Sequence, residues 1–143
     1  EEHRRLNAMV ADLREFLQQP RPAVGEKGAH SWSTELTRRL VRLHDSLSRH
    51  FQEEEEGGMM EELTEAHPRA TGAVESLVHE HEEILRGLRR CTAGAMEYSD
   101  GIEPAEASLR RRLVTILDCL HQHEVAETDL IQRLEYEEIG PGD

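Results

Sequence analysis

Aromatic residues, cysteines and basic charge are all scarce in this chain of 143 residues. Aromatic side chains make up 3% of it, and the two cysteines, Cys91 and Cys119, have no metal-binding spacing. Two such thiols indicate neither a disulfide framework nor a cysteine metal site, and they are typical of a reducing, cytoplasmic environment. The length fits one domain, which we expect to span residues 1–143 and to bury a core without disulfides.

Positive charge is in deficit, because 17 Lys and Arg face 30 Asp and Glu, a net charge of −13. A polyanion repels nucleic acid and anionic membrane surfaces, so we expect neither as a partner. No run of 18 apolar residues occurs, which excludes a membrane-spanning helix. The chain opens at Glu1 rather than a methionine. We therefore expect it to be trimmed or part of a longer chain, and its targeting stays open.

Leucine, glutamate, arginine and alanine recur throughout, and this composition favours helix. Proline and glycine segments divide the chain into four expected helices, at about 3–18, 32–56, 70–98 and 104–137. Pro20 stops the first, Gly57 and Gly58 end the second before a connector with room for one further turn, and Pro104 starts the last. The short connections predict an all-α fold, an up-down-up-down antiparallel four-helix bundle.

Apolar residues in each expected helix recur at steps of three and four, the pattern of residues facing the centre of a bundle. In the second helix the series is Leu36, Leu40, Leu43, Leu47, His50 and Glu54. In the fourth it is Leu109, Leu113, Ile116, Leu120, His123, Glu127, Leu130 and Leu134. The first and third helices contribute His3 and His81. Six polar residues are therefore expected in the core: His3, His50, Glu54, His81, His123 and Glu127.

Histidine and glutamate are costly to bury unless they are paired or bound to metal. At about 1.5 Å per residue, the four histidines all lie roughly 22–28 Å from the turns at one end of the bundle, so they meet at one level. One alternative is a buried polar network without metal, in which each charge needs its own partner. Another is a slipped register, which would bring in His79 or His121. His44 also lies one residue off the series.

The sequence contains an internal repeat. His-x-x-x-Glu occurs in the second and fourth helices, 73 residues apart from His50 to His123, and Glu-His occurs at Glu2-His3 and Glu80-His81. Two related helical hairpins would give the site approximate two-fold symmetry. Imidazole and carboxylate donors without thiolate favour iron or manganese over structural zinc. Four histidines and two bridging glutamates would leave about four of the roughly twelve positions on two ions for exogenous ligands.

Four segments in order resemble the ligand segments of hemerythrin-like HHE domains, over nearly the whole chain. They are Glu2-His3-Arg4-Arg5-Leu6, His50-Phe51-Gln52-Glu53-Glu54, Glu80-His81-Glu82-Glu83-Ile84-Leu85 and His123-Glu124-Val125-Ala126-Glu127. The resemblance implies a non-haem di-iron centre with an oxo or hydroxo bridge, with manganese or zinc as substitute metals. It implies that the four histidines are terminal ligands and that Glu54 and Glu127 are the bridges.

Two features depart from oxygen-carrying hemerythrins, which have a second histidine in the third helix and an aspartate after the histidine of the fourth. Here Leu77 and Leu85 lie one turn before and one turn after His81, so the second histidine is absent. The residue that follows His123 at a spacing of four is a glutamate, Glu127. We expect a solvent oxygen, or a loop residue such as His30, to occupy the coordination position that the absent second histidine would fill. We also expect Glu53, Glu55 and Glu56 to be a solvated run, with Glu53 the alternative partner for a ligand.

The chain therefore resembles the broader HHE group, which is linked to oxygen or iron sensing, nitric oxide chemistry and peroxide handling. We expect a metal-binding protein that binds or senses oxygen, nitric oxide or iron, with azide-like anions as further ligands. The alternative is a di-iron enzyme that handles peroxide or nitric oxide. A metal-independent helical scaffold is a third hypothesis. The sequence shows no dedicated acid–base residue near the expected ligands, which favours binding.

Overall fold

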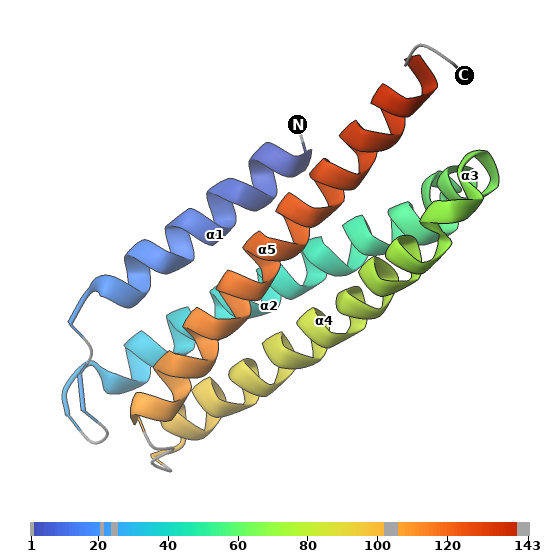
Figure 1. Ribbon diagram of the computed structural model, residues 1–143. Coiled ribbons are helices and arrows are strands. Elements are labelled where there is room, and N and C mark those ends of the chain that lie inside the picture. Colours follow the sequence, from blue (N-terminus) through green and yellow to red (C-terminus); the bar gives the residue numbers. More distant parts are fainter. Residues whose placement is uncertain (1, 21, 24–25, 102–105, 140–143) are drawn as a thin grey trace.

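Four long helices make up most of the computed structural model, which describes residues 2–20, 22–23, 26–101 and 106–139 (Figure 1). The long helices are α1 (Glu2–Gln18), α2 (Ala29–Glu56), α4 (Thr71–Ser99) and α5 (Glu106–Ile139). A short helix, α3 (Met59–Ala66), and the 3₁₀ turn η1 (Pro68–Ala70) join α2 to α4. No strand occurs among the described residues. The predicted all-α helical bundle is confirmed.

Proline and glycine shape the helix boundaries. α1 ends two residues before Pro20, where the proline ring disfavours another helical turn. Gly28 and Gly58 precede α2 and α3 with φ angles of 92° and 95°, left-handed values that are easy only without a Cβ. Pro104, the expected first residue of the last helix, lies outside the described residues, and α5 is described from Glu106.

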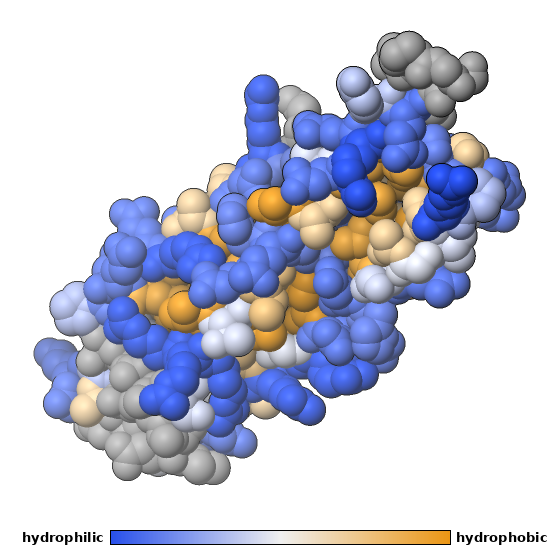
Figure 2. Space-filling model, viewed as in Figure 1, coloured by the Kyte–Doolittle hydropathy of each residue, from blue (hydrophilic) through white to orange (hydrophobic). Residues whose placement is uncertain are grey.

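The long helices run antiparallel in the ring order α1, α2, α4, α5, and each packs against its neighbours in that ring (Figure 1). α4 and α5 approach closely because Gly87 has no side chain. A Cβ there would lie 2.1 Å from Cδ1 of Ile116. Figure 2 shows a mostly polar face with a narrow band of apolar side chains between the polar ones. Among the described residues, no helix is both long and apolar enough to cross a membrane.

The apolar core forms two clusters, with buried polar residues between them along α4 and α5. The larger cluster draws on all four long helices and includes the leucine series of α2. The smaller one joins α3, η1, α4 and α5 and consists of Met60, Ala70, Val74, Leu77, Leu130 and Leu134. One register expectation is wrong, because Leu117 is fully buried whereas Ile116 is only partly buried, against Gly87. A helix with 3.6 residues per turn drifts from a strict 3.5-residue repeat.

Candidate metal centre

Six side chains from the four long helices converge between the two apolar clusters. Each of α2 and α5 contributes a histidine and a glutamate one turn apart, and each of α1 and α4 contributes one histidine. Five of the six are buried: His50, Glu54, His81, His123 and Glu127. His3 corrects the expectation of a core-facing residue, because 57% of its side chain is exposed. It lies in the first turn of α1, where solvent reaches its ring.

The Nε2 atoms of the three buried imidazoles face two buried carboxylates. His50 Nε2 and His81 Nε2 lie 3.5 Å and 3.4 Å from Oε1 of Glu54. His123 Nε2 lies 3.4 Å from Oε2 of Glu127. These five atoms are shielded from solvent and make no hydrogen bond within the described part of the chain. A buried polar atom without a partner costs about 1–3 kcal/mol, so five together need a common partner.

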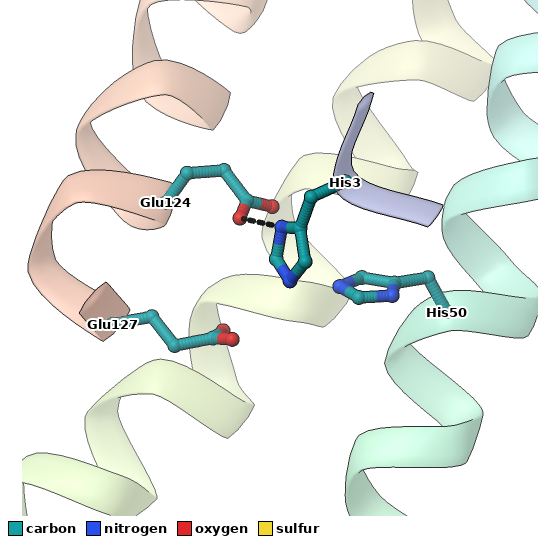
Figure 3. A group of neighbouring side chains, drawn as sticks. All are labelled: His3, His50, Glu124 and Glu127. Carbon is teal, nitrogen blue, oxygen red and sulfur yellow. Dashed lines mark ion pairs between the residues drawn. The ribbon is translucent and has the colours of Figure 1, made fainter. Parts of the chain in front are cut away.

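The donor atoms form two groups that share one glutamate. His3, His50, Glu124 and Glu127 offer ligand atoms within 4.8 Å of one another, and so do His81, His123 and Glu127. Figure 3 shows the first group, with the His3 and His50 rings nearly perpendicular to each other and the carboxylate of Glu127 on the same side. The ring centroids are 4.9 Å apart both for His3 and His50 and for His81 and His123. Glu127 therefore offers a ligand atom to each of the two groups.

Each of the four imidazoles has a glutamate near its Nδ1 atom. The Nδ1 atoms of His81 and His123 are hydrogen-bonded to Glu55 at 3.0 Å and to Glu80 at 2.9 Å. Nδ1 of His3 lies 3.3 Å from Glu124 (Figure 3), and Nδ1 of His50 lies 3.7 Å from Glu2. Glu53, Glu55 and Glu56 are all exposed, as expected of a solvated run, but Glu55, rather than the alternative Glu53, also contacts one of the histidines.

Sequence reasoning assigned no site role to these four glutamates, although each is adjacent in sequence to one of the six central residues. Glu2 and Glu80 precede a histidine, Glu124 follows one, and Glu55 follows Glu54. The repeated Glu-His pair was the one feature of the sequence that could have indicated a role for Glu2 and Glu80. Its meaning depends on how each helix is rotated against its neighbour, because residue i+1 points about 100° away from residue i.

The two central carboxyl groups have pKa values that shift in opposite directions. Burial raises the pKa of Glu54 to about 10, and the adjacent Glu127 adds to the shift. Burial also opposes ionisation of Glu127, but the neighbouring His123 imidazole and Glu54 carboxyl outweigh it and lower its pKa to about 2. Burial lowers the pKa of His81. The buried pair therefore keeps one proton between its two carboxyl groups near neutral pH, and a bound cation would displace that proton.

The remaining candidate ligands lie elsewhere. His79 and His121 are exposed, and His44 is half-buried beside Asp45. His30 lies at the start of α2, 20 residues and so about 30 Å from His50, which rules it out as the completing ligand. Cys91 is buried in the larger apolar cluster, and Cys119 is exposed. The donor set is therefore nitrogen and oxygen only, which suits iron, manganese or zinc.

A cavity of about 450 Å³ opens between α4 and α5 beside the site. Its lining includes Glu80, Ile84, Ile116, Cys119 and His123. His123 is thus both a member of the second donor group and part of the cavity wall. A small molecule in this cavity would lie next to the central donors.

Comparisons with known proteins agree with this geometry. No curated protein and no solved structure matches the chain. The family model for the hemerythrin HHE cation-binding domain matches residues 1–134, a span that contains every donor described above. Membership of that family implies metal binding, and the histidine and glutamate cluster fits it. The chain therefore belongs to the hemerythrin HHE cation-binding domain family.

Proposed function

We propose that this protein holds a non-haem di-iron centre and uses it to bind or sense a small oxidant or gas, such as oxygen or nitric oxide. In this proposal His3 and His50 serve one iron, and His81 and His123 serve the other. Glu54 and Glu127 bridge the two. Iron in this site would supply redox chemistry and open coordination positions for the small ligand.

One observation supports the metal assignment above all others. Five buried donor atoms face one another without hydrogen-bond partners in the described residues, and Glu127 belongs to both donor groups. A polar network without metal would leave these atoms unsatisfied in a low-dielectric interior. Glu54 supports a bridging role in the same way, because its Oε1 is within 3.5 Å of histidines from both groups.

Two observations favour a small exogenous ligand over a closed structural site. Four histidines and two bridging carboxylates leave about four positions on two six-coordinate ions unfilled. Leu77 is buried and Leu85 partly buried where a further histidine of α4 would stand, and neither can bind metal. The exposed ring of His3 gives water and small anions access from one side, and the cavity lined in part by His123 leaves room for a small molecule beside the other half.

Metal analysis of protein purified from iron-supplemented cells tests the centre directly. We expect about two irons per chain, with an optical spectrum typical of a di-iron site. His50→Ala or His123→Ala should halve or abolish the iron content. His44→Ala and His121→Ala remove histidines from the same helices outside the donor groups and should leave it unchanged. Iron that never exceeds one per chain, or equal losses in all four variants, would contradict the dinuclear assignment.

The small-ligand function needs a separate test. Azide titration of the diferric protein, followed optically, should show ready binding because the site is open to solvent on the His3 side. Stable oxygen uptake that reverses cleanly on deoxygenation would contradict this and indicate simple oxygen carriage. Rapid peroxide consumption by the iron-loaded protein, compared with the metal-free protein, would instead indicate the enzymatic alternative.

A further inference from the structure

Four glutamates outside the proposed ligand set surround the four histidines in a closed arrangement. We infer that Glu2, Glu55, Glu80 and Glu124 form a ring of positioning carboxylates that holds each imidazole with its Nε2 atom directed at the metals. The inference rests on the proposed di-iron function. The name outer carboxylate ring is used below for these four residues.

The ring is closed because every pair joins two neighbouring helices, and each neighbouring pair is joined once. Glu2 of α1 contacts His50 of α2, and Glu55 of α2 contacts His81 of α4. Glu80 of α4 contacts His123 of α5, and Glu124 of α5 contacts His3 of α1. Each long helix therefore supplies one glutamate and one histidine, and the order of pairs follows the order of helices around the bundle.

Chance contact in an acidic protein does not account for this order. Histidines outside the centre also meet acids, as His79 meets Glu83 at 3.2 Å and His44 meets Asp45 at 3.7 Å. In both cases the acid lies on the same helix, where such contacts follow from short sequence separation. In the outer carboxylate ring, each glutamate comes from another helix than the histidine that it contacts. All four glutamates face the Nδ1 atom of a proposed ligand histidine.

These contacts determine which tautomer each imidazole adopts. A carboxylate only accepts hydrogen bonds, so it favours the imidazole tautomer with the proton on Nδ1. The Nε2 lone pair is then directed at the centre, where it can bind a cation. The carboxylate also makes the imidazole a stronger base and limits its rotation. The outer ring would thus prepare four nitrogen donors before any metal arrives.

The four pairs are not equally tight, so their effects should differ. Glu55 and Glu80 lie within 3.0 Å of histidines that are almost fully buried. Glu2 and Glu124 lie 3.7 Å and 3.3 Å from their histidines. A hydrogen bond weakens beyond about 3.2 Å. We therefore expect Glu55 and Glu80 to have the largest influence on metal binding.

The test compares isosteric variants with matched controls. Glu55→Gln is paired with Glu53→Gln on α2, and Glu80→Gln is paired with Glu82→Gln on α4. Each control removes the same charge one residue from a proposed ligand, from an exposed glutamate with no contact to a central histidine. Metal affinity is measured by chelator competition on the loaded protein, and the optical spectrum of the diferric form is recorded.

We expect Glu55→Gln and Glu80→Gln to lower metal affinity by about 10- to 100-fold and to shift the spectrum, with the controls unchanged. Glu80→Asp, which keeps a carboxylate, should recover part of the loss. Glu2→Gln and Glu124→Gln should show the same effect at smaller size. The melting temperature of each metal-free variant should stay close to that of its control, which separates positioning from a loss of folding.

A second readout needs no metal. Nitrogen-15 NMR of the imidazoles in the metal-free protein, at a pH where they are neutral, reports which ring nitrogen carries the proton. The wild type should have it on Nδ1 of His81 and His123, and the Gln variants should lose this preference. Variants that match their controls in affinity and tautomer would overturn the outer ring, even if the wild type binds two irons. If the wild-type protein bound no metal, only the di-iron proposal would be overturned. The imidazole tautomers of the metal-free protein would still test the outer carboxylate ring.

Discussion

The two halves of the candidate centre contain equivalent donors in different surroundings. In the half built by α4 and α5, His81 and His123 are 1% and 2% exposed. In the half built by α1 and α2, His50 is buried but the side chain of His3 is 57% exposed. The internal repeat therefore specifies the same donors twice without specifying the same access to water.

The difference can be traced to two pairs of equivalent positions, shifted by the 73 residues that separate His50 from His123. Phe51 corresponds to Glu124, and Glu55 corresponds to Thr128. The phenyl ring of Phe51 stacks on His81 at a centroid distance of 3.9 Å. In the other half Glu124 contacts His3 in its place. An apolar ring covers the histidine of one half, and a carboxylate leaves the histidine of the other half exposed to solvent.

The largest expected effect is a difference in stability between variants of Phe51 and of its counterpart, Glu124. Phe51→Ala should lower the free energy of unfolding of the metal-free protein by about 3–5 kcal/mol, because the side chain is fully buried and its loss leaves a cavity. Glu124→Ala removes a partly exposed side chain and should change it by less than about 1 kcal/mol. Denaturant unfolding measures both values. Similar losses would show that the two halves are packed alike.

Replacing one histidine in each half sharpens the comparison. His81→Ala should weaken metal binding by about 100-fold, because the side chain is almost fully buried and Glu54 loses a buried neighbour. His3→Ala should weaken it by roughly tenfold or less, since water can take the place of an exposed ring. Metal content after dialysis against a weak chelator distinguishes the two. Equal retention in both variants would remove the distinction between the halves.

The wild type should release its two metals at different rates. The metal beside His3 and His50 should be removed first by a strong chelator, about tenfold faster than the metal beside His81 and His123. The physical reason is that chelator and protons reach the exposed half directly, whereas Phe51 covers the other. Stopped-flow absorbance should therefore show two phases. A single phase would indicate that the metals leave together.

The smallest expected effect is an increase in metal retention. Thr128→Glu places a carboxylate where the repeat predicts the counterpart of Glu55, near the exposed half. It should slow release of the first metal by a few-fold, because a second carboxylate near His3 strengthens the hold on its single Nδ1 proton, which Glu124 faces at 3.3 Å. Gln132→Glu adds the same charge one turn further along α5 and serves as the control. An equal change in both variants would show that charge alone, rather than contact with His3, is responsible.

Much of the fold was predictable because helical periodicity depends only on local sequence. Steps of three and four placed the leucines of α2 in the core and directed His50, Glu54, His81, His123 and Glu127 inward, as the structure has them. Leu117 was missed because a 3.5-residue repeat and the true 3.6-residue turn diverge over a long helix. The helix α3 was foreseen only as a further turn within a connector.

By itself, the sequence determined which residues face the centre, because burial makes polar residues on an apolar stripe stand out. It also determined the repeat that makes the donors equivalent. Only the tertiary structure decided that Glu55, Glu80 and Glu124 turn toward histidines, and that His3 meets solvent. Those contacts lie between helices, and they depend on the rotation and depth of each helix against its neighbour, which no pattern within one helix encodes.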